Sequence, residues 1–219
     1  MPGEISLAHR GVLFCDEFPE FPRHVLEALR QPMEDSFVTI SRAKGSVTYP
    51  ASFLLVAAAN PCPCGYYGDP KRSCTCFPGV ISRYQKRISG PILDRIDIHV
   101  DVPSVETQKL VDGDKTKRED SKKIQKRVQN ARDVQTRRFK LTKIKSNGDM
   151  STRDVKNFCP LTLECKQMLT SAVTSMNLSA RSYFKVIKIA RTIADIAGEK
   201  NISIIHIAEA LQYRPKLED

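Results

Sequence analysis

Short apolar runs that end in polar residues mark two strands in the first part of the chain. Gly11–Phe18 is apolar up to Asp16 and Glu17, and Ser52–Ala59 is an apolar run that leads into Asn60. Uninterrupted runs of this length are typical of strands buried on both faces of a parallel sheet. Because ligands bind such sheets at the carboxyl ends of the strands, we expect the two acids and the amide at one functional edge.

The segment between these runs predicts a helix and then a hairpin. Arg23–Gln31 has apolar residues at helical spacing, and this helix is expected to end at Pro32. Phe37–Tyr49 alternates in polarity on both sides of a glycine-containing centre, which predicts a β-hairpin. Arg42 and Lys44 lie at its tip, where they indicate either a phosphate contact or an ordinary solvent-exposed turn.

A loop, a helix and a third strand are expected next. Pro61–Pro78 contains four prolines and two glycines, a composition typical of a loop. Val80–Ser89 predicts a basic helix, with a break at Gly90. Ile96–Val102 alternates polar and apolar residues, which predicts a third strand that Pro103 closes.

The second half of the chain shows helical patterns. A polar connector, Thr107–Asp120, precedes a helix candidate whose apolar stripe is too thin for deep burial. Two or three further helices follow it. The expected helices lie at Ser121–Phe139, Leu161–Met176, Ser179–Ala197 and Ser203–Gln212.

The chain is predicted to have three parts, and its charge follows this division. We expect residues 1–105 to form an α/β core, 106–145 a basic linker and helix, and 146–219 a small all-α domain. Residues 1–105 carry 11 basic and 11 acidic side chains, whereas 106–219 carry 24 and 14. Lys109–Lys145 holds nearly all of the surplus, which indicates a solvated basic face or a surface for an anionic partner such as nucleic acid.

Composition excludes several classes of protein. Of the 219 residues 41% are hydrophobic and 27% charged, which excludes a chain disordered throughout. No apolar run approaches the roughly 18 residues of a membrane span, and the first residues lack the order of a secretory signal. We therefore expect a soluble, cytoplasmic protein with no membrane partner, in which seven cysteines are reduced thiols or bind a metal.

Several separated motifs follow one another along the chain in a fixed order. They are residues 1–18 ending in Cys-Asp-Glu-Phe, Leu29–Glu34, Val38–Arg42, Asn60–Gly65, Ser89–Asp97, Leu178–Arg181 and Ala210–Arg214. Together they resemble the magnesium-chelatase-like AAA+ ATPases of the ComM and YifB type. The resemblance covers essentially the whole chain, and it implies a partial AAA+ P-loop NTPase core followed by a small α-helical lid.

The resemblance also implies roles for five residues. Asp16 and Glu17 resemble the Walker B acid associated with Mg²⁺ and the catalytic base, and Asn60 resembles sensor 1. Arg95 resembles the arginine finger that reaches the nucleotide of a neighbouring subunit, and Arg181 resembles sensor 2 on the lid. ATP and Mg²⁺ as cofactors and a hexameric ring are implied with them. Taken alone, the acid pair could be a solvated strand end and Arg95 a local salt bridge.

The predicted hairpin adds a partner to this interpretation. Phe37–Tyr49 is similar to the insertion before sensor 1 in the AAA+ branch that contains magnesium chelatases and replicative helicases. In ring helicases of that branch such hairpins contact DNA in the central pore. The resemblance thus implies DNA contacts for Arg42 and Lys44.

The sequence departs from the family pattern in one respect. It contains no G-x-x-x-x-G-K-[ST] motif, the loop that cradles the phosphates and completes the Mg²⁺ shell. We therefore expect the chain to correspond to the C-terminal half of a larger protein and to hydrolyse ATP negligibly by itself.

Four cysteines in the predicted loop form a compact pattern. Cys62, Cys64, Cys74 and Cys76 make two C-x-C pairs, and four thiolates can bind Zn²⁺ tetrahedrally. Within each pair the two cysteines are separated by one residue, which is fewer than in the usual C-x₂₋₄-C spacing. A loop of reduced thiols and a redox or disulfide role are therefore alternatives to zinc.

The leading functional hypothesis is a fragment of an ATP-driven DNA motor of the branch-migration or helicase type, acting in natural transformation. One alternative is a chelatase-like motor that inserts a metal and works on a protein partner. A second is an inactive, truncated remnant without the phosphate-binding loop.

Overall fold

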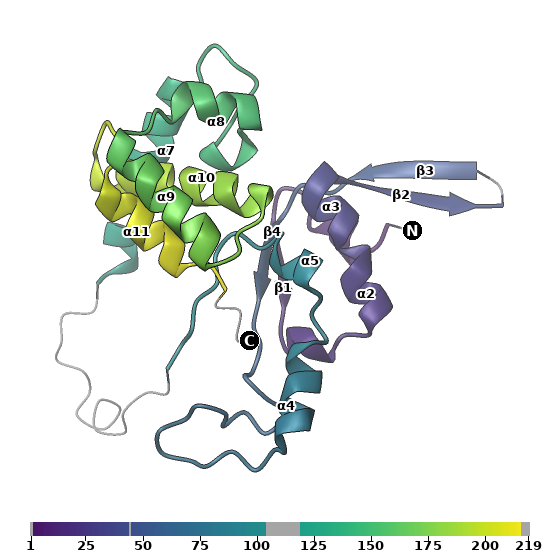
Figure 1. Cartoon of the computed structure of the whole chain (residues 1–219). Coiled ribbons are helices and arrows are strands. Elements are labelled where there is room, and N and C mark those ends of the chain that lie inside the picture. The colour runs from purple at the N-terminus through teal and green to yellow at the C-terminus, as the bar shows by residue number, and fades with distance from the viewer. Residues whose placement is uncertain (1, 44, 104–118, 216–219) are drawn as a thin grey trace. The chain divides into compact units, whose positions relative to one another are not determined.

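The computed structural model describes residues 2–43, 45–103 and 119–215 (Figure 1). The chain forms two compact units, Met1–Ile96 and Asp97–Asp219. The first is mixed α/β, and the described part of the second is helical, which confirms the fold class expected of a partial AAA+ core with a helical lid. The three-part division stays a prediction, because its first boundary lies outside the described residues.

The first unit contains the two predicted strands and the predicted hairpin. Strand β1 (Val12–Cys15) pairs in parallel with β4 (Leu54–Ala57), with Val12 opposite Leu54 and Cys15 opposite Ala57. Strands β2 (Phe37–Arg42) and β3 (Gly45–Pro50) form the antiparallel hairpin, which extends as a ribbon away from β1 and β4 (Figure 1). These elements confirm the strand and hairpin predictions.

The β1–β4 sheet is covered on one face. The core beneath it is made of Cys15, Phe18, Leu26, Leu29 and Ile92, all at most 8% exposed. On the opposite face the strands present apolar side chains that are 41–62% exposed, namely Val12, Phe14, Leu54 and Val56. The expectation that both strands are buried on both faces is therefore wrong, because burial needs a packed layer on each side of a sheet.

The described part of the first unit also contains six short helices. They are α1 (Glu4–Leu7), the 3₁₀ helix η1 (Phe18–Glu20), α2 (Arg23–Ala28), α3 (Arg30–Asp35), α4 (Pro78–Gln85) and α5 (Gly90–Leu93). Pro32 does not end the predicted helix; it lies in the first turn of α3. A proline is tolerated there because the N–H groups of the first turn have no partner within the helix.

The predicted third strand is absent from the structure. Residues 96–102 form no strand, and Ile98, Val100 and Val102 are 52–85% exposed. The backbone N–H of His99 donates instead to the carbonyl of Tyr213, at 2.9 Å. An alternating pattern is not sufficient for a strand, because the backbone groups also need a neighbouring strand as partner.

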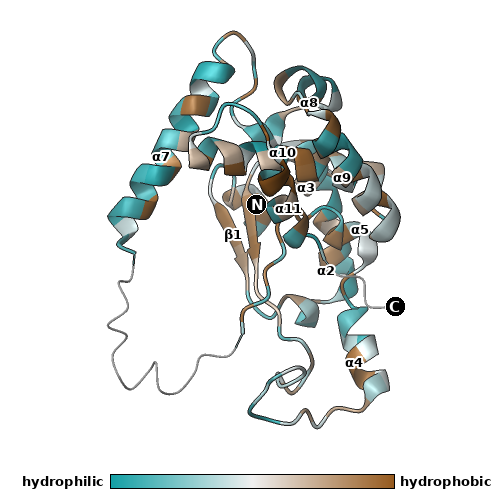
Figure 2. Ribbon diagram, turned by 60° about the vertical axis from the view of Figure 1, so that its left-hand side comes forward, coloured by the Kyte–Doolittle hydropathy of each residue, from teal (hydrophilic) through white to brown (hydrophobic). Residues whose placement is uncertain are grey.

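The second unit is a bundle built around one central helix. Its described helices are α7 (Ser121–Arg138), η2 (Asn147–Asp149), α8 (Thr152–Phe158), α9 (Leu163–Ser175), α10 (Ala180–Ala197) and α11 (Ile204–Gln212). The four predicted helices are confirmed, whereas α8 was not predicted. Helix α10 supplies the fully buried Val186 and Ala190 to the core. As predicted, α7 is hydrophilic over most of its surface (Figure 2).

Local sequence signals define both ends of α10. The hydroxyl of Ser179 accepts a hydrogen bond from the N–H of Ser182 at 3.1 Å, a standard N-cap. Gly198 follows the last turn with φ 76°, in the left-handed region that favours glycine. None of the described helices combines the length and the apolar character that crossing a membrane requires.

Candidate functional site

The predicted acids and amide lie at the same edge of the β1–β4 sheet. Asp16 and Glu17 directly follow β1, and Asn60 lies three residues after β4. Two backbone hydrogen bonds hold the strand ends together: the N–H of Ala58 donates to Cys15 at 2.9 Å, and the N–H of Phe18 donates to Ala58 at 2.8 Å. The parallel pairing thus brings three exposed polar side chains to one carboxyl edge.

The backbone at the acid pair is strained. Glu17 adopts φ 48° and ψ 43°, a left-handed conformation that is costly for a residue with a side chain. Its N–H donates to Oδ1 of Asp16 at 2.9 Å, and the next residue, Phe18, is 1% exposed. The buried ring and the hydrogen bond hold Glu17 in this conformation. Strain of this kind concentrates at functional sites.

Arg95 is held within the first unit by specific contacts. Its Nη2 pairs with the carboxylate of Glu34 on α3 at 2.5 Å, and its Nη1 donates to the carbonyl of Pro91 at 2.9 Å. The Arg95 side chain is 14% exposed. Two elements therefore fix the orientation of this guanidinium group.

The remaining predicted residues lie elsewhere. Arg42 is the last residue of β2, opposite Gly45 at the hairpin tip. Its side chain, and Lys44 as a whole, lie outside the described residues. Arg181 is the second residue of α10, in the second unit, and is exposed.

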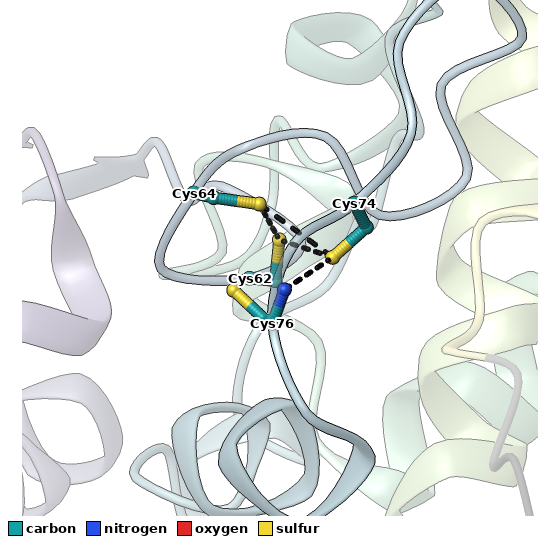
Figure 3. Close-up of side chains that lie close together, drawn as sticks. All are labelled: Cys62, Cys64, Cys74 and Cys76. Carbon is teal, nitrogen blue, oxygen red and sulfur yellow. Dashed lines mark hydrogen bonds between the residues drawn. The ribbon is translucent and has the colours of Figure 1, made fainter.

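The four cysteines of the loop converge. The Sγ atoms of Cys62 and Cys64 lie 3.3 Å apart, and the Sγ of Cys74 lies 3.7 Å and 3.5 Å from them. All four sulfur atoms, including that of Cys76, lie within 4.8 Å of one another (Figure 3). Hydrogen bonds from the backbone N–H groups of Tyr66 and Thr75 lower the pKa of the Cys64 thiol to about 5.

A cationic pocket lies between α4 and the segment that enters α2. Its volume is about 560 Å³, and its lining contains four cations and no carboxylate. The lining residues are Phe21, Arg23, Gly79, Ser82, Arg83, Lys86 and Arg87. Arg87 also pairs with Glu20 at 2.5 Å. We call the site formed by these seven residues the cationic pocket.

Sequence reasoning missed this pocket, although part of its signal was visible. Arg83 in α4 and Lys86 and Arg87 just after it stand out in the sequence, but Arg23 lies sixty residues before Arg83. A single arginine at the start of a helix has no pattern that marks it as functional. The tertiary structure alone brings it to the face of α4.

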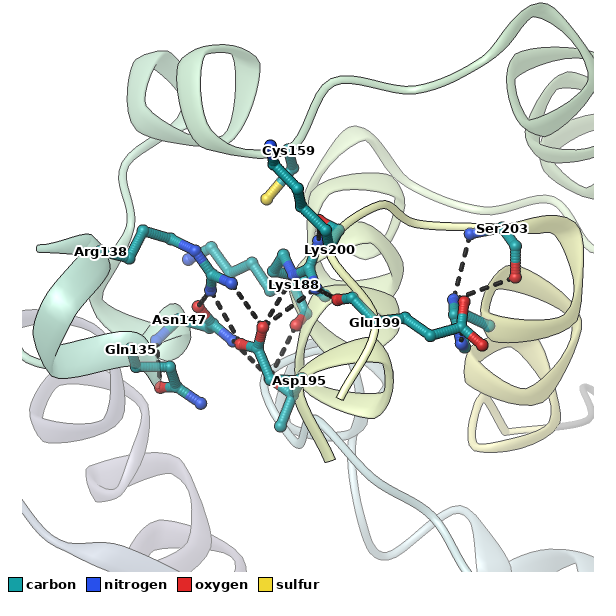
Figure 4. A network of polar contacts seen from close by, with 12 residues as sticks. Gln135, Arg138, Asn147, Cys159, Lys188, Asp195, Glu199, Lys200 and Ser203 are labelled. Carbon is teal, nitrogen blue, oxygen red and sulfur yellow. Dashed lines mark hydrogen bonds and ion pairs between the residues drawn. The ribbon is translucent and has the colours of Figure 1, made fainter. Parts of the chain in front are cut away.

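A second polar cluster, inside the second unit, was also missed. Asp195 on α10 is fully buried and forms ion pairs with Arg138 and Arg191 (Figure 4). Its Oδ2 accepts a hydrogen bond from Nδ2 of Asn147 at 2.8 Å. Every polar atom of the carboxylate is thus engaged by the protein, so this network is structural.

The fold and the sheet edge define a class before any comparison. A mixed α/β unit with two acids and an amide at its carboxyl edge, followed by a helical unit, is the arrangement of a partial AAA+ core with its lid. Two family models match the chain: "Magnesium chelatase, subunit ChlI" over residues 1–110 and "Magnesium chelatase, subunit ChlI C-terminal" over residues 118–214.

Curated relatives match over nearly the whole chain. It is 43% identical over 215 residues to the competence protein ComM of Haemophilus influenzae, and 41% identical over 217 residues to the uncharacterized protein YifB of Escherichia coli. Each alignment covers 97% of this chain but 40% and 41% of the respective relative. The chain therefore belongs to the magnesium-chelatase-like family of ComM and YifB, and it spans about two-fifths of the length of these relatives.

Proposed function

We propose that this chain is part of a cytoplasmic, ring-forming ATPase that moves or separates DNA strands. The placement of Asp16, Glu17 and Asn60 at one carboxyl edge carries the proposal. In this arrangement Asp16 would hold Mg²⁺, Glu17 would orient and deprotonate the attacking water, and Asn60 would help to place that water. When bound, Mg²⁺ would neutralise the negative charge that develops on the phosphates.

Arg95 and Arg181 complete the proposed ATP site. As an arginine finger, Arg95 would act on the nucleotide of the next subunit in a hexameric ring. Its ion pair with Glu34 and its bond to Pro91 support a fixed orientation, which such a residue needs. Arg181, at the start of α10, would contact the phosphates as sensor 2.

DNA as the partner is supported by charge. The cationic pocket offers Arg23, Arg83 and Lys86 to an anion, and within the described residues none of these three forms an ion pair. The hairpin of β2 and β3, whose backbone pairing ends at Arg42 and Gly45, would bring Arg42 and Lys44 to the DNA in this proposal. The name of the relative ComM refers to competence, which supports natural transformation as the setting of the proposed role. The activity that we propose in this setting is branch migration or helicase activity.

The ATPase proposal is tested in a chimera. The region of H. influenzae ComM that this chain matches is replaced by the chain, and ATP hydrolysis is measured with Mg²⁺. We expect Glu17→Gln to lower kcat by about 100-fold or more, the contribution of a general base. Glu4→Gln, an exposed acid on α1, is the control and should leave kcat unchanged. Equal rates for Glu17→Gln and the parent chimera would contradict the proposal.

The DNA proposal is tested by salt dependence. Binding of a fluorescent single-stranded oligonucleotide to the 219-residue chain is measured by anisotropy at several salt concentrations. Replacing Arg83 and Lys86 by Gln should reduce the slope of log K against log salt by about 0.7 for each phosphate that the variant no longer neutralises. Lys166→Gln, an exposed change on α9, should not change the slope. Identical slopes for all three proteins would count against a DNA contact at the cationic pocket.

A metal-insertion motor acting on a protein partner is the second candidate. The family models bear the name of magnesium chelatase, and the ChlI subunit of Chlorella vulgaris is 33% identical over 60 residues, 27% of this chain. Glu17-dependent ATP hydrolysis in the chimera without any salt-sensitive DNA binding would favour this candidate. If the chimera does not hydrolyse ATP while unaltered ComM does so under the same conditions, the result would instead favour an inactive remnant.

A further inference from the structure

The four cysteines come together in a segment that has no regular structure. Between Ala57, the end of β4, and Pro78, the start of α4, the chain forms neither helix nor strand. Two separate C-x-C arms nevertheless meet with all four Sγ atoms within 4.8 Å of one another (Figure 3). Chance proximity in a loop does not account for four converging thiols, whereas a shared ligand does.

The spacing of the sulfur atoms fits a tetrahedral metal site. With Zn–S bonds of about 2.3 Å, the sulfur atoms of a regular tetrahedron lie about 3.8 Å apart. The recorded separations are 3.3, 3.5 and 3.7 Å. A disulfide needs about 2.05 Å, and all seven cysteines are free thiols. The cluster therefore has the size of a metal site without the bonds of a disulfide framework.

The donor set and its surroundings select the metal. Four sulfur ligands, without histidine or carboxylate, favour zinc over Mg²⁺ or Ca²⁺, which prefer oxygen. Four protein ligands leave no open position, as in structural zinc sites. The cluster would carry a charge of about −2 when four thiolates hold Zn²⁺, and Lys71 and Arg72 lie in the loop between its two arms.

Several contacts within the loop fix the course of its backbone. The N–H of Cys76 donates to Sγ of Cys74 at 3.4 Å. Between the two arms, Oδ1 of Asp69 accepts from the N–H groups of Lys71 and Arg72 at 2.7 and 3.0 Å, which forms a turn. The guanidinium of Arg72 lies over the ring of Tyr66, 5.2 Å from its centre. These contacts direct both arms toward one point.

We propose that Cys62, Cys64, Cys74 and Cys76 bind one structural zinc ion. This site is distinct from the proposed ATP site and does not depend on it. Cys62 follows Asn60 by two residues, and Cys76 precedes α4 by two residues. The zinc ion thus ties the strand end that bears Asn60 to α4, which together with the two residues after it supplies most of the cationic pocket.

Metal content tests the proposal directly. The 219-residue chain is purified without chelators and analysed by mass spectrometry for metals, and we expect about one zinc ion per chain. Cys74→Ser should retain less than about a tenth of that amount, because a structural site needs all four ligands. Cys15→Ser removes a thiol outside the loop and is the matched control; it should keep its zinc. Iron in place of zinc, or equal zinc in all three proteins, would overturn the proposal.

Cobalt substitution of the unaltered chain provides a test that needs no variant to fold. Zinc is removed with a chelator under reducing conditions and Co²⁺ is added. We expect intense thiolate-to-cobalt charge-transfer bands and the d–d bands of a tetrahedral site, both abolished when zinc is added back. An octahedral spectrum without charge-transfer bands, with all four loop thiols open to alkylation in the presence of zinc, would refute the site.

Discussion

Asp195 provides a quantitative test of how the second unit is held together. The change Asp195→Asn keeps the shape of the side chain and removes its charge. The carboxylate is 0% exposed and pairs with two guanidinium groups, Arg138 (17% exposed) and Arg191 (3% exposed). Asn147 adds a hydrogen bond at 2.8 Å. The substitution would therefore leave two largely buried positive charges without their counter-ion (Figure 4).

The magnitude follows from this geometry. Removing one partner of a buried ion pair costs about 3–5 kcal/mol, because the remaining charge is buried without compensation. Arg191 also donates to the carbonyls of Glu199 and Lys200, at 2.6 and 2.8 Å, and keeps these bonds in the variant. We therefore expect Asp195→Asn to lower the free energy of unfolding by about 3 kcal/mol, the lower end of that range.

The same network makes stability depend on pH. Burial raises the pKa of Asp195, but hydrogen bonds from Arg138 and Asn147 and the charge of Arg191 outweigh it, so the pKa falls below its ordinary value of 3.8. A lowered carboxyl pKa stabilises the folded state fully above the unfolded value, and this contribution is lost as pH falls through the folded value. Acid unfolding of the unaltered chain should thus contain a component below pH 3.8 that Asp195→Asn lacks.

Urea unfolding followed by far-ultraviolet circular dichroism measures both effects, because most of the helix lies in the second unit. Glu119→Gln is the matched control. Glu119 pairs with Arg127 at 2.8 Å, but the two side chains are 43% and 49% exposed, so the expected loss is at most about 1 kcal/mol. Equal losses for Asp195→Asn and Glu119→Gln, or an unchanged acid profile, would refute the reasoning.

Two further predictions concern the ends of α10, and the same urea assay measures both. Ser179→Ala should lower the free energy of unfolding by about 1 kcal/mol because the N-cap hydrogen bond is removed, whereas Ser179→Asp should retain most of it; equal stability of the two variants would contradict this. Gly198→Ala should lower the free energy of unfolding by about 1 kcal/mol, because an alanine is strained at a φ of 76°. The strain is the only cause expected, since a Cβ at this position would meet no atom within 4 Å. A stabilising effect of Gly198→Ala would show that the helix ends differently in solution.

Local patterns were sufficient for much of the fold. The apolar runs predicted β1 and β4, and the alternation on both sides of Gly45 predicted the hairpin. The ends of α10 were readable from Ser179 and Gly198. These features depend on a few neighbouring residues, because side-chain periodicity, caps and left-handed turns are properties of a short stretch of backbone.

Patterns that depend on a distant partner were not readable in the same way. The alternation in Ile96–Val102 looks like a strand, but within the described residues no strand lies beside it. The apolar runs of β1 and β4 predicted burial on both faces, yet packing covers one face. Periodicity states which face is apolar, whereas a second element decides whether that face is covered.

The same distinction between local patterns and distant partners applies to the candidate sites. Asp16, Glu17, Asn60 and the cysteine pairs were recognisable as residues suited to phosphoryl transfer and to a metal. Their convergence depends on the parallel pairing of β1 with β4 and on the path of the loop, both of which join residues far apart in the chain. Arg23 in the cationic pocket and Asp195 between its arginines have no local signature. Only packing gives them partners, because the charge around a side chain is set by residues that are neighbours in space.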